Sequence, residues 1–265
     1  MSDWFHALPL GWMALAVFGG TALVSAAIYW IVIHLATDER ARAFKAVSPG
    51  LLPPLGIIFG LLVAFIAAQI WGDVDRATAA VNREASSLRA VVLLSRSFPG
   101  DAQTRMRAHL ERYIQEAHEV EWPAMERQRA TLTMIPPGIG ESLELAIALP
   151  TATQGQVAAQ RELVANLDNA LDARRQRILV SRSEVNWVKW LTLILQGVCT
   201  LVAIAMVHCD HRAAARFAMG LFGTAIAVSI FLLVAHDRPF TGQLSVRPTP
   251  LLQILPDSTV TAKGS

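Results

Sequence analysis

The sequence predicts an all-α fold: a four-span helical membrane protein with a helical soluble bundle that extends from spans two and three. Composition is the first observation, because 53% of the 265 residues are hydrophobic and 17% are charged, whereas soluble domains carry about 25% charged residues. The second is that apolar residues cluster into four stretches, each matching the ~20 residues that a helix needs to cross a bilayer. The third is that no segment alternates apolar and polar residues over a useful length, as strands do.

The four apolar stretches are almost free of charge and run over residues 10–35, 50–71, 187–207 and 217–236. The first lacks a basic leading region and is too long for the apolar core of a signal peptide, so we expect it to be retained as a helix. The ends of these stretches divide the chain into four parts. They are a first membrane helix pair (residues 1–71), a soluble helical insert (72–185), a second membrane helix pair (186–236) and a tail (237–265).

The insert between spans two and three has the pattern of amphipathic helices. Residues 73–98 contain no Pro or Gly, and Val74, Val81 and Leu88 recur every seven residues on one face. This helix is expected to continue span two out of the membrane. Further helices are expected over residues 102–121, 141–149 and 156–185, and the last of them is expected to run on into span three.

Motifs for enzyme chemistry do not occur in the sequence. It has no Gly-rich phosphate loop, no nucleophile elbow and no paired Cys-x-x-Cys. The residues best suited to a metal, 208–211, are interpreted as a polar turn at the membrane interface, because a metal site needs a full ligand set. We therefore expect no enzyme, no cofactor and no metal. The net charge of +2 is too small to indicate nucleic acid binding.

A basic cluster precedes span three at Arg174, Arg175 and Arg177. One interpretation is a site for an anion or a lipid head group. The other, which we favour, is ion pairing with acids on neighbouring helices, such as Asp172 or Glu84.

Span two carries a stripe of bulky apolar residues on one helical face: Leu55, Phe59, Leu62 and Ile66. Such a face can line a hydrophobic constriction that gates by excluding water. Packing against lipid or other helices is the alternative, since every membrane helix has apolar faces. Gly56 and Gly60, four residues apart, permit a close helix contact.

Several motifs occur in consistent order between residues 51 and 252. They comprise residues 80–85 with Asn82, Arg83 and Glu84; residues 121–125 with Trp122 and Pro123; residues 171–175 with Asp172, Arg174 and Arg175; and residues 237–242 with Asp237, Arg238, Pro239 and Phe240. Together they resemble the bacterial bestrophin-like membrane protein family, which is named for a distant similarity to the bestrophin anion channels.

The resemblance implies an oligomeric ion channel for anions or small monovalent ions, a homo-oligomer in the lipid bilayer, with the pentamer of bestrophins as its model. The stripe on span two would then be the pore neck. The acidic run that binds calcium in animal bestrophins is reduced to Asp237, so no calcium gating is expected. The alternative is a non-conducting membrane scaffold or signalling protein.

The motif at residues 237–240 is expected to be structural. Pro239 cannot continue a helix interior and is expected to end span four. Arg238 is expected to pair with an acid of the insert, for example Glu84, and Phe240 to pack on the first soluble helix.

The charge distribution gives two answers on orientation. If only the basic residues of the short loops are counted, at residues 36–49 and 209–216, the insert is placed outside. Counting all basic residues near the span ends, together with the resemblance, places it in the cytoplasm. We adopt the second answer, for a multi-pass protein of the bacterial inner (cytoplasmic) membrane.

Overall fold

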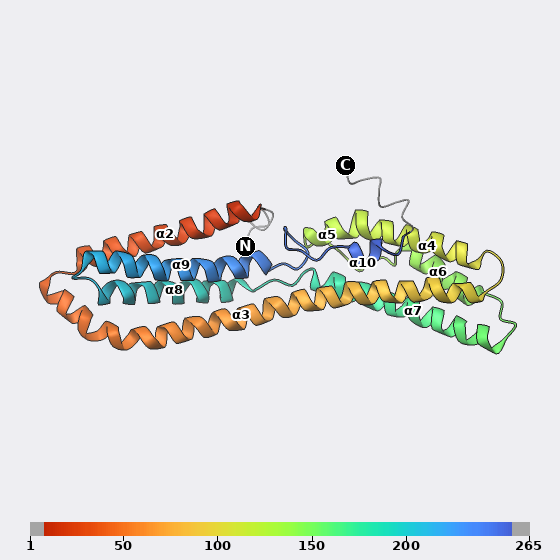
Figure 1. Ribbon diagram of the computed structural model, residues 1–265, viewed down its shortest axis with the longest axis horizontal. Coiled ribbons are helices and arrows are strands. Elements are labelled where there is room, and N and C mark those ends of the chain that lie inside the picture. Colours follow the sequence, from red (N-terminus) through yellow and green to blue (C-terminus); the bar gives the residue numbers. More distant parts are fainter. Residues whose placement is uncertain (1–7, 256–265) are drawn as a thin grey trace. The chain divides into compact units, whose positions relative to one another are not determined.

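The computed structural model describes residues 8–255, apart from the side chains of residues 38, 45 and 47–49. These residues form helices joined by turns and loops, with no strand in the described part of the chain, which confirms the all-α prediction (Figure 1). The chain divides into two compact units. We call them the membrane unit and the soluble unit and describe each by itself.

The membrane unit contains the chain up to Gly72 together with Glu184–Asp237. Its helices are α2 (Leu10–Leu35), the first part of α3 (Asp38–Leu94), α8 (Trp187–Val207) and α9 (Arg212–His236). Each contains a stretch long and apolar enough to cross a membrane, which confirms the four predicted spans.

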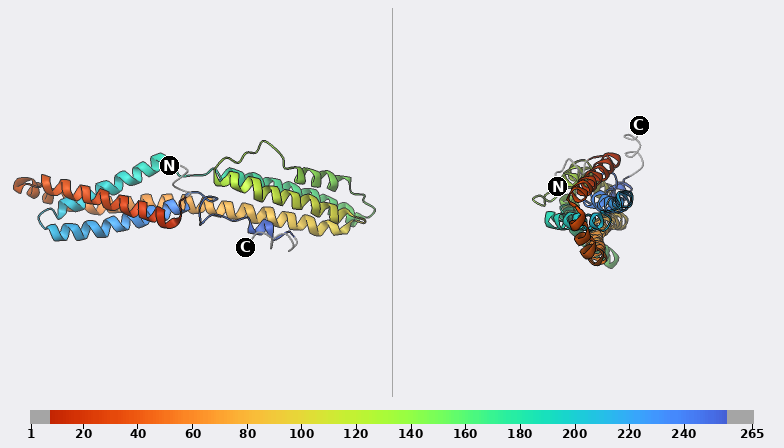
Figure 2. Two further views of the ribbon diagram at one scale, coloured as in Figure 1. Left: turned by 90° about the horizontal axis from the view of Figure 1, so that it is seen from above. Right: turned by 90° about the vertical axis from the view of Figure 1, so that its left-hand side faces the viewer.

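Helices α2, α8 and α9 of the membrane unit pack against one another. Helix α2 lies beside both α8 and α9, and these two lie beside each other (Figure 1, Figure 2). A Cβ atom at Gly197 of α8 would lie 3.6 Å from Phe59 of α3 and 3.6 Å from Ile226 of α9. The glycine therefore lies where three helices approach closely, as small residues do in membrane bundles. Gln196 of α8 adds a hydrogen bond, donated by its Nε2 to the carbonyl of Leu55 at 3.1 Å.

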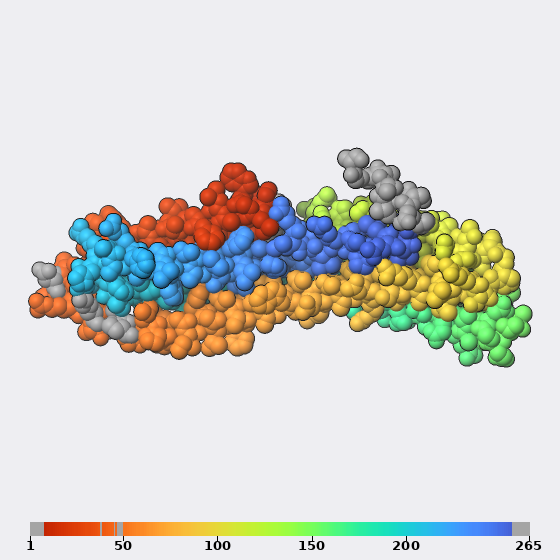
Figure 3. Space-filling view, in the orientation of Figure 1, coloured from red at the N-terminus to blue at the C-terminus, as the bar shows by residue number. Residues whose placement is uncertain are grey.

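The soluble unit contains Asp73–Ser183 and the chain from Arg238 onward. Its elements are the last part of α3, η1 (Ser95–Ser97), α4 (Ala102–Glu116), η2 (Ala117–Glu121), α5 (Trp122–Glu126), α6 (Pro137–Ala148), α7 (Gln154–Val180) and α10 (Thr249–Leu252). The segment around α10 lies beside the last part of α3 (Figure 3), where Arg89 Nη2 lies 3.4 Å from the Pro250 carbonyl and 3.3 Å from Gln253 Oε1.

The approach of α4 and α6 depends on one residue. A Cβ atom at Gly138 would lie 2.4 Å from the carbonyl oxygen of His109 and 2.8 Å from the backbone nitrogen of Tyr113. Since both are backbone atoms, no side-chain movement can make room. Glycine is therefore required at this position.

Two predicted boundaries are wrong. Helix α7 ends at Val180 and α8 begins at Trp187, so the expected continuous helix into span three does not form. Asn186 provides the reason, because its side chain caps α8 by accepting the backbone N–H of Val188 at 2.9 Å. The segment expected as a loop at 36–49 is also largely helical, because α3 begins at Asp38.

Candidate functional site

Four elements of the soluble unit bring four charged side chains and one tyrosine together in its interior. These side chains form what we call the charge network: Glu84 of α3, Tyr113 of α4, Glu121 of η2, and Arg174 and Arg177 of α7. Glu84 and Arg177 are completely buried, with 0% of each side chain exposed. Burying charged groups is costly unless they are paired, so the geometry of the pairing decides what the network does.

Arg177 is the centre of the charge network. Its Nε donates to Glu84 Oε2 at 2.8 Å and its Nη2 to Glu84 Oε1 at 3.1 Å, which is a two-point guanidinium–carboxylate pair. Nη2 also donates to Glu121 Oε2 at 2.9 Å. The guanidinium carbon Cζ lies over the Trp122 ring, 4.8 Å from the ring centre, within the range of a cation–π contact.

The remaining members complete the charge balance. Arg174 Nε donates to Glu121 Oε1 at 2.7 Å, so two arginines face two glutamates. The Tyr113 hydroxyl donates to Glu84. Glu121 lies in η2, a turn of π-helix. Such a turn widens the helix locally and is often found at functional sites.

The environment fixes the protonation of the central groups. Burial raises the pKa of Tyr113 well above its ordinary value, and the Glu84 carboxylate adds to the rise while Arg177 opposes it. Burial alone would lower the pKa of Arg177, but Glu84, Tyr113 and Glu121 together raise it above its ordinary value. Arg177 therefore stays charged and Tyr113 stays a donor. This arrangement suits fastening of helices rather than proton transfer.

The basic cluster behaves as the favoured interpretation predicted. Arg177 pairs with Glu84, and Arg175 pairs with Asp172 at 2.8 Å on the surface. Arg177 and Tyr113 hold the Glu84 carboxylate. The expected pairing of Arg238 with an acid of the insert, for which Glu84 was the example, stays a prediction.

Aromatic residues of two predicted motifs also meet in the soluble unit. Phe240 is buried, and its ring meets Trp122 of α5 edge-on, with 5.7 Å between centroids. The prediction named the first soluble helix as its neighbour, and Phe240 shares a buried core with residues of α3 such as Leu88, while its ring partner is on α5. Trp122 Nε1 also donates to the Val246 carbonyl at 3.3 Å, which ties the tail to α5. Pro123 lies in the first turn of α5, which follows directly on the π-helical turn η2.

Other predicted motif residues lie at helix surfaces or ends. Asn82 and Arg83 are exposed on α3, and Arg83 Nη1 donates to Gln176 Oε1 at 3.3 Å. Helix α9 ends at His236, shortly before Pro239. Asp237 is buried, and its Oδ1 accepts the backbone N–H of Val185 at 2.9 Å.

Sequence reasoning missed Tyr113 and Glu121 as members of the charge network. Each is a polar group in an otherwise apolar stripe of its helix, which is the one signal that could have found them. Spacing along one helix cannot show which acid a buried arginine will meet.

The stripe of span two lies against the protein itself in the single chain. Phe59 and Ile66 are 7% and 4% exposed and belong to the core of the membrane unit, and Leu62 packs against that core. Leu55 is only partly exposed, and its carbonyl binds Gln196 of α8. The pore-lining role of these residues stays a prediction for the assembled protein, whereas in one chain Leu55 and Phe59 contact α8 and Leu62 and Ile66 pack in or against the core of the membrane unit.

A different face of α3 is exposed. Its bulky apolar residues, which we call the open face, are Ile57, Ile58, Leu61 and Phe65. Phe65 is 71% exposed. Gly56 and Gly60 have open space where a Cβ atom would lie, so neither forms a close helix contact within the chain.

Four helices long and apolar enough to cross a membrane, together with a helical unit whose interior holds paired charges, are typical of a multi-pass helical membrane protein. Residues 19–251 match the family model described as Bestrophin-like domain, and the chain belongs to the bestrophin-like family. No curated protein and no solved structure matches the chain.

Proposed function

We propose that the chain is one subunit of an oligomeric membrane channel for anions or other small monovalent ions. Membership of the bestrophin-like family supports this. The observation that carries the proposal is the open face of α3, where Leu61 and Phe65 present apolar side chains that no other part of the described chain covers. Copies arranged around an axis would bring these residues together, and rings of them would form an apolar constriction that excludes water.

Two phenylalanines of α3 provide the test. Phe59 is buried against α8 and Phe65 is exposed, and they point about 120° apart around the helix. Ion flux is measured on purified full-length protein in liposomes, with the mass of the oligomer determined in parallel. Phe65→Ala is expected to widen the constriction and raise flux. Phe59→Ala is expected to lower thermal stability, because emptying a core site costs about 3 kcal/mol.

The proposal fails if the wild-type protein and Phe65→Ala are folded and oligomeric but pass no ions. It also fails if both variants change flux equally at equal stability, because the two faces of α3 would then not differ. Oligomer mass further decides whether the assembly is the pentamer that the family resemblance suggests.

A non-conducting scaffold or signalling protein is the second candidate. The observation in its favour is that Phe59 and Ile66, two of the four predicted neck positions, are already used in packing within the chain. A scaffold gives folded protein without flux and no difference between the faces of α3. Neither candidate assigns a catalytic role to any residue.

We further propose that the soluble unit faces the cytoplasm of a bacterium, with the membrane unit in the inner membrane. Thr151 lies exposed in the loop before α7 and is a suitable labelling position. Thr151→Cys, in a background where Cys199 and Cys209 are replaced by Ala, is expected to resist an impermeant thiol reagent in intact cells and to react after lysis. Labelling in intact cells would reverse the orientation.

A further inference from the structure

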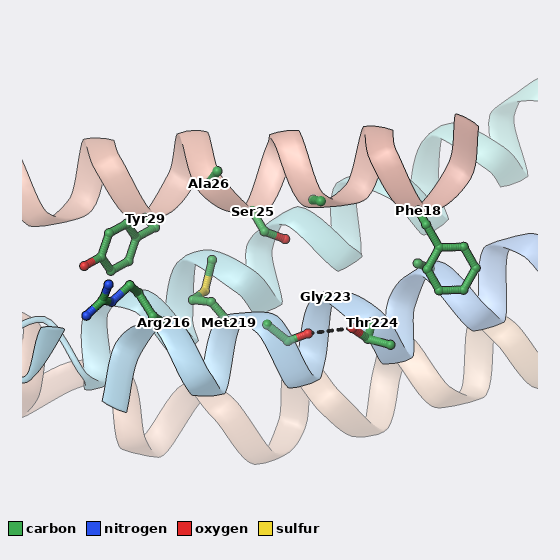
Figure 4. A pocket seen from close by; sticks show the side chains of 11 residues that line it. Phe18, Ser25, Ala26, Tyr29, Arg216, Met219, Gly223 and Thr224 are labelled. Atoms are coloured by element: carbon green, nitrogen blue, oxygen red, sulfur yellow. Dashed lines mark hydrogen bonds between the residues drawn. The ribbon is translucent and has the colours of Figure 1, made fainter. Parts of the chain in front are cut away.

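A groove of about 490 Å³ lies between α2 and α9 in the membrane unit (Figure 4). Small residues of the two helices form its walls: Ala22, Ala26, Gly220, Gly223 and Ala227. Its volume lies within the range of about 300–1,000 Å³ typical of ligand sites.

One end of the groove is polar and basic. Arg216 of α9 and Tyr29 of α2 lie near each other there, as Figure 4 shows. Arg216 Nε lies 3.4 Å from the backbone carbonyl of Arg212, and no carboxylate among the described side chains pairs with its guanidinium. Because Arg216 lies near the first residue of α9, this end is expected at the membrane interface, where arginine meets lipid phosphates.

The opposite end of the groove is apolar. Phe18 of α2 lines this end, and the centroid of its ring lies 6.4 Å from the ring centroid of Phe231 on α9. From Phe18 to Tyr29 the groove follows α2 for roughly 16 Å, at 1.5 Å of rise per residue. That length matches about half of the ~30 Å hydrocarbon core, which is the depth of one lipid leaflet.

A buried hydroxyl inside the groove has no partner. Ser25 is 9% exposed, and its Oγ makes no hydrogen bond within the described chain. Thr224 in the same groove behaves differently, because its hydroxyl donates to the Gly220 carbonyl at 2.8 Å (Figure 4). A buried hydroxyl without a partner is costly, so Ser25 indicates an occupant that offers an oxygen at this depth.

We propose that the groove binds one acyl chain of an anionic phospholipid, with the phosphate on Arg216 and Tyr29 and an ester oxygen at Ser25. Ser25 lies about 6 Å along α2 from Tyr29, one helical turn deeper, in the order in which ester follows phosphate in a phospholipid. The charge of Arg216 selects the anionic head group, and the small residues leave room for the chain.

The charge of Arg216 is tested by native mass spectrometry of the full chain, purified and stripped of lipid. Phosphatidylglycerol and a diacylglycerol with the same acyl chains are the two probes. The wild type is expected to retain phosphatidylglycerol over diacylglycerol, and Arg216→Gln to bind phosphatidylglycerol about tenfold more weakly. Arg212→Gln, on the same helix but outside the groove, is the matched control and is expected to bind as the wild type does. Equal binding by Arg216→Gln and Arg212→Gln would overturn the proposal.

Filling the groove gives an independent test. A Cβ atom at Gly220 meets nothing within 4 Å, so Gly220→Leu occupies the groove without a clash at its base. It is expected to lose phosphatidylglycerol, while Gly20→Leu, at an exposed position of α2 with equally open space, retains it. Unchanged lipid binding by Gly220→Leu overturns the proposal. So does a change of oligomer mass without loss of lipid, because the groove would then receive another copy of the chain.

Discussion

Replacing Arg177 by methionine removes the cation at the centre of the charge network while keeping an unbranched side chain of similar reach. The change leaves Glu84 fully buried with only the Tyr113 hydroxyl as a donor, and it takes one of two arginine partners from Glu121. An uncompensated buried carboxylate is the main cost, because the attraction that offset its loss of water is gone.

The expected loss of stability follows from that burial. Breaking a buried ion pair by removing one partner costs about 3–5 kcal/mol. At roughly 2–4 °C for each kcal/mol in a chain of this size, the melting temperature should fall by roughly 6–20 °C. Protonation of Glu84 in the variant would place the fall at the lower end of this range.

Arg175→Met is the matched control, two residues away on the same helix. Its partner is Asp172, and the two side chains are 62% and 57% exposed. An exposed ion pair contributes under about 1 kcal/mol, so the control should change the melting temperature by no more than about 4 °C. Thermal unfolding of both variants in detergent measures the difference. If Arg177→Met loses no more stability than Arg175→Met, the network does not fasten the soluble unit.

The close approach of α4 and α6 gives a second prediction. Gly138→Ala should destabilise the protein by about 1–3 kcal/mol, because the new Cβ atom would meet the His109 carbonyl, whereas Gly140→Ala, with open space on the same helix, should gain up to about 1 kcal/mol. Equal melting temperatures for the two variants would contradict the packing argument. A third prediction concerns pH. Folding raises the pKa of Tyr113, so the stability contributed by its protonated hydroxyl is fully present below about pH 10, the ordinary pKa of tyrosine. This stability is lost as the pH rises further. Melting curves from pH 8 to 11.5 should show a shallower alkaline loss in Tyr113→Phe than in the wild type, and identical slopes would count against this.

The spans and helices were predictable because they depend on local pattern. Four apolar stretches of sufficient length identify four spans whatever surrounds them, since the bilayer requires helices of that length. The break before α8 was less accessible. Asn186 before an apolar run is a capping signal, which the prediction from the periodicity of residues 156–185 did not use.

Partners across helices could not be predicted in the same way. The pairing of Arg177 with Glu84 was foreseen as one option among several, because a buried arginine near a span needs an acid. Which acid it meets depends on how α3 and α7 pack, and no spacing within one helix determines that. The stripe at Phe59 shows the same limit, because identical apolar side chains suit a lumen, a neighbouring helix or lipid.

The motifs that carry the family resemblance converge on one place in the soluble unit. Glu84 binds Arg177, whose guanidinium lies over Trp122, and the Trp122 ring meets Phe240. Polar and aromatic residues are recognisable in a sequence when buried packing requires them at fixed positions. The motifs that resemble the family therefore hold the helices of the soluble unit together. The surfaces that would serve ions or lipids, the open face of α3 and the groove beside α9, consist of ordinary apolar and small residues. Function on such surfaces depends on which side of a helix a residue occupies. Comparing Phe65→Ala with Phe59→Ala, and Gly220→Leu with Gly20→Leu, measures that dependence.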